Sequence, residues 1–306
     1  MDNLVSVIIP TYKRPFGTLV KAINSVLEQS YSNLEVIIVD DSPNGDSNRN
    51  EVENKIKTLV DPRVRYIQHE FNQGACSARN SGIEVCRGKY IAFLDDDDEW
   101  LSKKLELQLA KFENTEVGLV YCDSYTITLK DDKEIKKDMR ANRVSGWVYD
   151  KLILDNFIGS TSFIMLRKEA LDTCGFFNNN LKSAQDYELW LRISKKYKVD
   201  YVDTPLVNYY VHEGERISTN IDYRIQGLEK INELNMNYLG LHPKVNCLRN
   251  LKLVPYYNKK YGHKVAFLKW LEAVKLYPFQ TENIKCFINI INYTFQKNVC
   301  HIDRRN

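Results

Sequence analysis

The sequence lacks the glycine-rich loops with which many nucleotide-binding folds hold phosphate. No G-x-G-x-x-G follows the first predicted strand, and no G-x-x-x-x-G-K-[ST] occurs anywhere in the 306 residues. These two absences exclude a Rossmann dehydrogenase and a P-loop NTPase, because each needs its loop. Glycine (13) and proline (8) are also scarce, which excludes collagen-like and low-complexity chains.

Long apolar runs and paired cysteines are missing as well. No stretch of 18 apolar residues exists, so the sequence predicts no transmembrane helix. The first apolar run ends at Pro10 and follows no basic segment, which is untypical of a signal peptide. The seven cysteines are scattered without a C-x-x-C pair, so they indicate reduced thiols and neither a disulfide framework nor a zinc site. A cytoplasmic location follows as the expectation.

Charge is distributed unevenly along the chain. Residues 221–306 hold 14 Lys and Arg against 6 Asp and Glu, whereas residues 1–220 hold 29 against 34. A basic tail with Phe267, Leu268 and Trp270 near lysines could lie peripherally on the inner, anionic face of a membrane. The alternative is a helical cap with a solvated basic face. Nucleic-acid binding is disfavoured, because no recognition module accompanies the charge.

The hydrophobic pattern predicts an α/β fold. Continuous apolar runs at 5–10, 34–40, 64–68, 89–95 and 118–128 are typical of buried strands, and segments with helical spacing separate them. This alternation predicts a mainly parallel central sheet with helices on both faces. Farther along, we expect a charged turn near 130–138 and a strand pair around 199–211. Residues 222–306 read as mostly helical, so the predicted domains are 1–220 and a helical extension, 221–306.

Polar residues follow three of the predicted strands. They are Pro10, Thr11, Tyr12 and Arg14 after the first strand, Asp40 and Asp41 after the second, and Asp95–Asp98 after the strand at 89–95. In an open parallel sheet, ligands bind beyond the carboxyl ends of the strands. The sequence therefore predicts that these clusters lie on one edge and form one site.

Four consecutive aspartates repel one another unless a cation intervenes. Mg²⁺ and Mn²⁺ are held by carboxylate and phosphate oxygens, so the run Asp95–Asp98 indicates a divalent-cation site. The alternative is that these acids only complement the N-terminus of the helix that follows. Arg14 and Arg79 are candidates for binding phosphate, or else ordinary surface arginines.

Two later residues are candidates for chemistry. Asp186 lies in the first turn of a predicted helix, where it is either a helix-terminal acid or a general base. His212 follows an aromatic run and is either structural or a ligand of the same cation.

Taken together, these segments resemble family-2 glycosyltransferases of the GT-A fold. The resemblance is carried by VSVIIPTYKRP, LEVIIVDDSPNGD, NQGACSARNSGI, GKYIAFLDDDDEWLSKKLE, GFFNNNLKSAQDYELWLRI and YYVHEGERIS, in that order. It implies inverting transfer of a sugar from a nucleotide-diphosphate donor, most often a UDP-sugar, to a hydroxyl acceptor. The acceptor would be a carbohydrate or a lipid-linked oligosaccharide, and the cofactor Mn²⁺ or Mg²⁺.

The resemblance also implies a role for each candidate residue. The nucleotide would be bound by Pro10, Thr11, Tyr12, Arg14, Asp40, Asp41, Arg79, Asp95 and Asp96. The metal would be held by Asp97, with Asp98 as its alternative in the run of four, and by His212. Asp186 would be the general base, although Gln185 stands where the family usually has glutamate.

Two other functions stay open at this point. A catalytically inactive sugar-nucleotide-binding subunit would share the fold, but the joint presence of the acid run and Asp186 argues against it. A nucleotidyltransferase would show a glycine-rich loop after the first strand, which PTYKRPFG is not.

Overall fold

The computed structural model describes residues 3–130, 133–139, 143–211 and 220–302. Of residues 129–130, 133 and 293–302 it describes the backbone alone. The chain forms two compact units, one of Met1–Asn179 with Gln185–Glu213 and the other of Asn180–Ala184 with Gly214–Asn306. Each unit is described separately below, and the predicted domain boundary at residue 220 stays a prediction.

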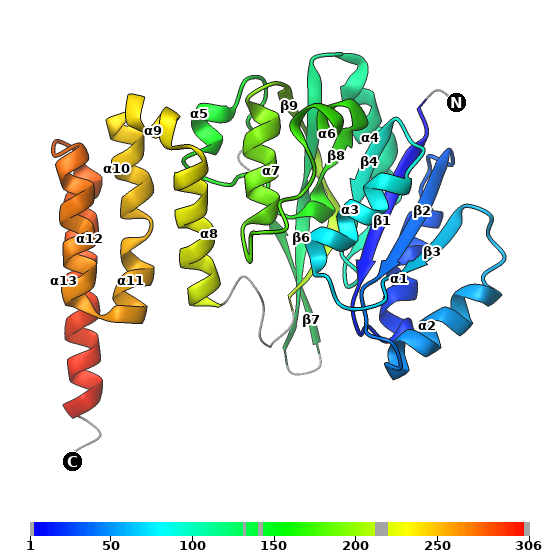
Figure 1. Cartoon of the computed structure of the whole chain (residues 1–306), viewed down its shortest axis with the longest axis horizontal. Coiled ribbons are helices and arrows are strands. Elements are labelled where there is room, and N and C mark those ends of the chain that lie inside the picture. Colours follow the sequence, from blue (N-terminus) through cyan, green and yellow to red (C-terminus); the bar gives the residue numbers. More distant parts are fainter. Residues whose placement is uncertain (1–2, 131–132, 140–142, 212–219, 303–306) are drawn as a thin grey trace. The chain divides into compact units, whose positions relative to one another are not determined.

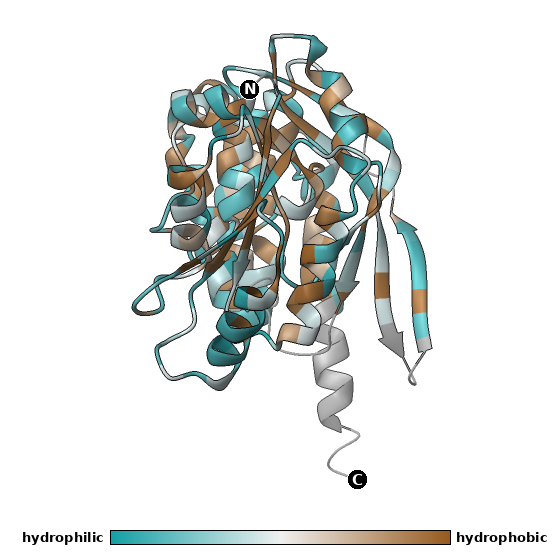
Figure 2. Cartoon of the chain, turned by 90° about the vertical axis from the view of Figure 1, so that its right-hand side faces the viewer, coloured by the Kyte–Doolittle hydropathy of each residue, from teal (hydrophilic) through white to brown (hydrophobic). Residues whose placement is uncertain are grey.

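The first unit is built on one sheet of nine strands (Figure 1). The strands are β1 (Val5–Thr11), β2 (Leu34–Asp40), β3 (Val64–Gln68), β4 (Tyr90–Phe93), β5 (Glu99–Trp100), β6 (Val117–Lys130), β7 (Lys133–Met139), β8 (Met165–Arg167) and β9 (Lys198–Val211). Their order is β3-β2-β1-β4-β8-β6-β9-β5, with β7 paired to β6. In Figure 2 the strands in the middle of this sheet are largely brown, in keeping with their apolar residues.

The sheet has a parallel half and a mixed half. Strands β3, β2, β1 and β4 are all parallel, as the apolar runs predict. Beyond β4, strand β8 is antiparallel to both β4 and β6, whereas β6 and β9 are parallel. The predicted α/β fold with a central sheet is confirmed, and the parallel half carries the edge on which the polar clusters were expected.

Helices cover both faces of this sheet. They are α1 (Phe16–Leu27), α2 (Ser47–Thr58), α3 (Ala75–Val85), α4 (Lys104–Ala110), α5 (Tyr149–Leu152), α6 (Lys168–Cys174) and α7 (Gln185–Ser194), with 3-10 turns η1 (Lys111–Glu113) and η2 (Thr161–Phe163). Helices α1, α2 and α4 share a core with Val5, Val7 and Ile9 of β1. Helix α3 packs on the opposite face, where a Cβ on Gly82 would lie 2.5 Å from the Ile8 side chain. Only glycine therefore permits this close approach of helix and strand.

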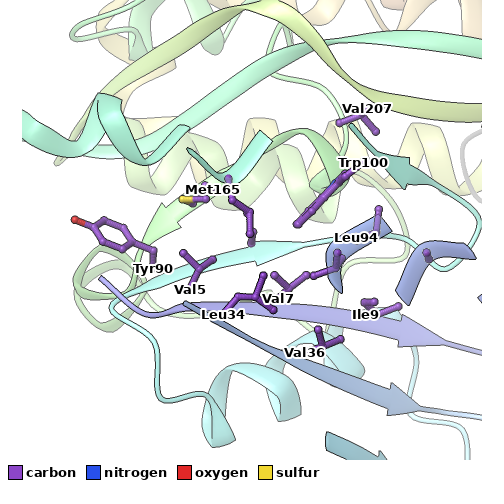
Figure 3. Close-up of a cluster of buried hydrophobic side chains, with 14 of the residues drawn as sticks. Val5, Val7, Ile9, Leu34, Val36, Tyr90, Leu94, Trp100, Met165 and Val207 are labelled. Carbon is purple, nitrogen blue, oxygen red and sulfur yellow. The ribbon is translucent and has the colours of Figure 1, made fainter. Parts of the chain in front are cut away.

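The main core continues from the sheet to the segment after β4. Figure 3 shows Leu94, Trp100 and Met165 beside the side chains of β1 and β2. Trp100 is 4% exposed, so its indole anchors the segment that follows the acid run. Burying an aromatic ring of this size stabilises a fold by about 2–3 kcal/mol.

Two local predictions for the middle of the chain are wrong. The expected charged turn is largely strand β7, because residues 133–139 pair along β6 and cross-strand pairing outweighs their weak β propensity. The expected strand pair is the single strand β9, which runs parallel to β6 with register shifts near Asp123. A sequence pattern does not distinguish one irregular strand from two short ones.

The second unit is helical, as predicted for the C-terminal residues. Its helices are α8 (Ile221–Leu234), α9 (Met236–Leu241), α10 (Pro243–Leu251), α11 (Val254–Tyr261), α12 (His263–Leu276) and α13 (Thr281–Ile302). Three small clusters hold them together, one of which joins Val254, Ala266 and Ile290. No helix of the described residues is long and apolar enough to cross a membrane. The six cysteines with described side chains are free thiols.

Candidate active site

The carboxyl ends of β1, β2 and β4 bring the predicted clusters together. Thr11 pairs with Asp40 at the end of the β1–β2 ladder, and Ile8 pairs with Phe93 at the end of β4. The Thr11 hydroxyl donates to Asp96 Oδ2 over 2.7 Å. Two segments that are 85 residues apart in sequence thus meet at this edge.

The four aspartates alternate in exposure. The side chains of Asp95 and Asp97 are 29% and 25% exposed, whereas Asp96 and Asp98 are buried. Arg14 contacts one buried and one partly exposed aspartate. Its Nε donates to Asp96 Oδ1 over 2.9 Å, and its guanidinium lies 3.2 Å from Asp97 Oδ2. Burial raises the pKa of Asp96 above its ordinary value, and Arg14 opposes that shift.

Asp98 points into the protein. It accepts hydrogen bonds from the Ser162 hydroxyl (2.6 Å) and from the backbone N–H of Tyr210 (3.1 Å). Burial, followed by the negative charge of Asp95, raises its pKa well above the ordinary value. Asp98 therefore ties the acid run to β9 and η2.

Asp95 is held by a guanidinium and two hydroxyl groups. Arg79 of α3 lies 2.7 Å from Asp95 Oδ1, and the Thr161 hydroxyl donates to the same oxygen over 3.2 Å. The Ser160 hydroxyl donates to Oδ2 over 3.3 Å, and the backbone N–H of Asp95 donates to Ser162 Oγ. We call Ser160, Thr161 and Ser162 the hydroxyl triplet.

Three side chains after the acid run bind the backbone of this segment. Trp100 Nε1 donates to the carbonyl of Ser162 (2.9 Å), and Gln108 Nε2 donates to that of Phe163 (2.9 Å). Lys104 Nζ lies 3.4 Å from the carbonyl of Ile164 and 3.9 Å from the centre of the Trp100 ring. Residues 100, 104 and 108 are spaced four apart in the sequence. Their side chains contact the carbonyl groups of the three consecutive residues Ser162, Phe163 and Ile164.

The acids after β2 organise the neighbouring loop. Asp41, which is 3% exposed, accepts hydrogen bonds from the backbone N–H groups of Gln73 (2.8 Å) and Gly74 (2.7 Å). Its Oδ1 also lies 2.7 Å from Nδ1 of His69. Asp40 accepts from the Tyr66 hydroxyl over 2.6 Å. Asp41 thereby fixes the loop that leads into α3 and Arg79, and Asp40 holds the end of β3.

Asp186 lies in the first turn of α7. The backbone N–H of Tyr187 donates to its Oδ1 over 2.7 Å, and the preceding Ala184 has a φ of 56°. Burial raises the pKa of Asp186, while Arg79 lowers it and Asp95 raises it further. The Arg79–Asp95 pair therefore lies close enough to Asp186 to act on its charge.

The comparisons with known proteins identify the family of the chain. The family described as Glycosyl transferase family 2 matches residues 6–175, which is more than half of the chain. The chain belongs to glycosyltransferase family 2.

Two relatives of this glycosyltransferase come from Escherichia coli. WfgD is named a UDP-Glc:alpha-D-GlcNAc-diphosphoundecaprenol beta-1,3-glucosyltransferase and is 31% identical over 220 residues, which cover 72% of this chain and 81% of WfgD. WfaP, which bears the same enzyme name, is 31% identical over 252 residues, covering 80% of this chain and 91% of WfaP. Among solved structures, Staphylococcus aureus TarS 1–349 in complex with UDP-GlcNAc matches with a TM-score of 0.58 and 17% identity. That match covers 94% of this chain and 79% of the TarS chain, and it confirms a fold of the GT-A type.

The remaining predicted residues of this glycosyltransferase are less fully enclosed. Pro10 pairs with Val39 at the end of β1 and is half-buried. Tyr12 is 47% exposed, with the Lys13 ammonium 5.5 Å from its ring centre. His212 lies outside the described residues, so its predicted metal contact stays a prediction. Within the described ranges, no group of three or more His, Cys, Asp or Glu side chains could hold a metal ion.

Sequence reasoning about this glycosyltransferase missed the hydroxyl triplet. Serine and threonine in GSTSF read as a loop, and nothing in their spacing points to carboxylates 60 residues earlier. The usable signal was the run of three hydroxyls directly before the apolar strand β8. The contacts of Lys104 and Gln108 were also missed, because nothing in the sequence indicates which buried carbonyl groups these two buried polar side chains reach.

Proposed function

We propose that this family-2 glycosyltransferase transfers a sugar from a nucleoside-diphosphate donor, a UDP-sugar, to an acceptor hydroxyl with inversion at the anomeric carbon. One observation carries the proposal: Arg79 pairs with Asp95 of the acid run at the carboxyl edge of the sheet, and both residues act electrostatically on Asp186. This part of the edge thus combines charged groups that can stabilise an anionic leaving group with a carboxylate that can act as a base. It is the edge at which ligands of open parallel sheets bind.

The nucleotide would lie along the ends of β1 and β2. Arg14 and Arg79 now pair with Asp97 and Asp95, so each guanidinium is available to exchange part of that pairing for a diphosphate oxygen. The β1 end with Pro10, Thr11 and Tyr12 would form the wall against the base and ribose. Asp41 would act by holding the loop before α3 in place, and Asp40 by holding the end of β3.

The acid run fits a divalent cation of the kind that this family generally uses. Mg²⁺ in substrate complexes is typically held by one or two carboxylates together with phosphate oxygens, and does not need a protein cage. Asp95 and Asp97 are the two partly exposed carboxylates of the run and would hold it, while Asp98 is engaged with Ser162 and Tyr210. Bound there, the cation would neutralise charge on the departing nucleoside diphosphate.

Asp186 would act as the general base. A carboxylate accepts the proton of an attacking hydroxyl best when its pKa lies near the working pH, and burial moves the pKa of Asp186 in that direction. The hydroxyl would attack the anomeric carbon from the side opposite the diphosphate, which inverts the configuration. The positive charge of Arg79 opposes the effect of burial on the pKa of Asp186 and so favours its ionised form.

The substrates are proposed from the relatives. WfgD and WfaP bear names that describe glucosyl transfer to a diphosphoundecaprenol-linked GlcNAc. An acceptor of this chemical class would place the enzyme in the synthesis of a cell-surface polysaccharide or a lipid-linked oligosaccharide. Peripheral contact of the basic helical unit with an anionic membrane would be consistent with such an acceptor.

The proposal is tested with UDP-glucose and UDP-GlcNAc in the presence of Mn²⁺. We expect slow UDP release in water, and the Asp186→Asn variant should lose about 10²–10⁴-fold in rate while UDP affinity changes less than twofold. Asp97→Ala should lose the Mn²⁺-dependent part of UDP affinity in calorimetry. Asp172→Asn, an exposed acid of α6, is the matched control and should behave like the wild type.

Three results would contradict the proposal. The first is UDP binding that does not respond to Mn²⁺ or Mg²⁺. The second is an Asp186→Asn variant with near-normal rate. The third concerns stereochemistry, because early NMR spectra of UDP-α-glucose hydrolysis should show β-glucose, and initial release of α-glucose would exclude inversion.

A further inference from the structure

A cavity of about 300 Å³ lies beside the acid run. Its wall comes from β6, β7, β9 and the segment 157–163 that carries the hydroxyl triplet. Its aromatic surfaces are Phe157, Phe163 and Tyr209, the last two in edge-to-face contact with ring centres 5.6 Å apart. The volume is at the lower end for ligand pockets, which suits one small ring system.

The lining is uncharged but has hydroxyl groups. No Asp, Glu, Lys, Arg or His side chain lines the cavity among the residues that the structure describes. Ser124 and Thr126, on the same face of β6, both line it. Ser124 is 5% exposed, and within the described part of the chain its hydroxyl has no hydrogen-bond partner. Because Ser124 lines the cavity, a ligand that hydrogen-bonds to its hydroxyl is favoured over one that displaces solvent from it without replacing the hydrogen bond.

The cavity is joined to both halves of the active site. The Ser160 side chain lines it and donates to Asp95 Oδ2. The neighbouring Gly159 accepts at its carbonyl from Trp190 Nε1 over 3.3 Å. Trp190 lies one turn after Asp186 on α7, so the wall of the cavity is held to the side of the helix that carries the proposed base.

We propose that this cavity is the subsite for a neutral hexopyranose unit, the sugar of the acceptor that receives the transferred group. The inference rests on the proposed function, because it takes Asp186 as the group that deprotonates the acceptor. An uncharged sugar offers hydroxyls to Ser124 and Thr126 and C–H faces to the aromatic rings. The phosphate groups of donor or acceptor find no counter-charge there, and a hydrocarbon chain would leave the hydroxyl of Ser124 unsatisfied.

The experiment measures binding without turnover. Methyl glycosides of glucose, galactose, mannose and N-acetylglucosamine are titrated into the whole chain with saturating UDP and Mn²⁺, and saturation-transfer NMR reports contact. Ser124→Leu fills the cavity, Ser124→Ala removes only the hydroxyl, and Thr128→Leu makes a comparable change farther along β6, outside the lining. Folding of each variant is checked by its UDP affinity.

We expect at least one glycoside to bind the wild type and the Thr128→Leu variant. Ser124→Ala should weaken that glycoside at least threefold and Ser124→Leu at least tenfold, with UDP affinity unchanged in both. The inference is overturned if no glycoside binds, or if binding survives Ser124→Leu. It is also overturned if Ser124→Leu weakens UDP-glucose or UDP-GlcNAc tenfold relative to UDP, since the cavity would then hold the donor sugar.

The same titrations separate this inference from the proposed function. If the wild type does not bind UDP in the presence of Mn²⁺, the proposed function is contradicted. Normal UDP binding without any contact from the glycosides would contradict only the acceptor subsite.

Discussion

Replacing Lys104 with methionine should remove a pH dependence from the stability of the first unit. Lys104 is fully buried on α4, and its ammonium contacts the Gln108 amide oxygen (2.7 Å) and the Trp100 ring. Within the described residues no carboxylate forms an ion pair with it. Burial therefore lowers the pKa of Lys104 from 10.5 to about 8, although the nearby Cys122 acts in the opposite direction.

The sign of the effect follows from proton binding. The unfolded chain keeps Lys104 protonated up to about pH 10.5, whereas the folded chain releases the proton near pH 8. Between these values the unfolded state binds more protons, so the free energy of unfolding rises with pH. Since one pKa unit corresponds to about 1.4 kcal/mol, this group adds roughly 2 kcal/mol between pH 7.5 and 9.5.

Urea unfolding at several pH values between 7.5 and 9.5 measures this directly. The Lys104→Met variant should show a slope about 1 kcal/mol per pH unit shallower than the wild type. Its stability at pH 7.5 should change little, because relief of the buried charge offsets about 1–3 kcal/mol from leaving Gln108 Oε1 without a donor. The neighbouring exposed Lys103→Met is the control. Equal slopes in wild type and Lys104→Met would refute the reasoning.

Two further predictions concern the hydroxyl triplet and the helical unit. Ser162→Ala removes the hydroxyl that bridges the backbone N–H of Asp95 and the carboxylate of Asp98. We expect the free energy of unfolding in urea to fall by about 2–3 kcal/mol and Mn²⁺-dependent UDP binding, measured by calorimetry, to weaken. If both values are unchanged, the bridge is unimportant. An exposed apolar stripe on α13, near Lys285, is formed by Ile284, Ile288 and Ile291. The chain should therefore float with anionic vesicles in a density gradient. Either the Ile288→Glu substitution or 0.5 M salt should release it from the vesicles. Equal flotation with neutral vesicles would contradict the role of the basic residues.

Much of the parallel half of the fold was readable from the sequence. Strands β1, β2 and β3 begin and end within one residue of the predicted limits. Their apolar runs are continuous and their ends carry turn-forming residues, so local pattern and tertiary packing agree. The site edge followed from this, because a parallel sheet brings its carboxyl ends together.

The mixed half of the sheet was harder to predict, because its structure depends on pairing between strands that are far apart in the sequence. Strand β7 is rich in Lys and Glu and exists through its ladder with β6. Strand β9 depends on register shifts against β6, which no local pattern encodes. The hydroxyl triplet likewise acquires its partners through folding, since Asp95 and Asp98 lie more than 60 residues before it.

The alternation within the acid run follows from how the chain crosses the edge of the sheet. Leaving β4, it turns at residues 96–97, where the backbone N–H of Asp98 donates to the carbonyl of Asp95, and then enters β5, which pairs with β9. Asp96 meets Thr11 and Arg14, and Asp98 meets Ser162 and Tyr210. Each inward acid thereby holds a different strand, and their loss would move Asp95 and Asp97 together. Substituting Asp96 or Asp98 would consequently displace the other acids as well as remove a carboxylate. A test of the proposed metal ligands therefore has to start from Asp97.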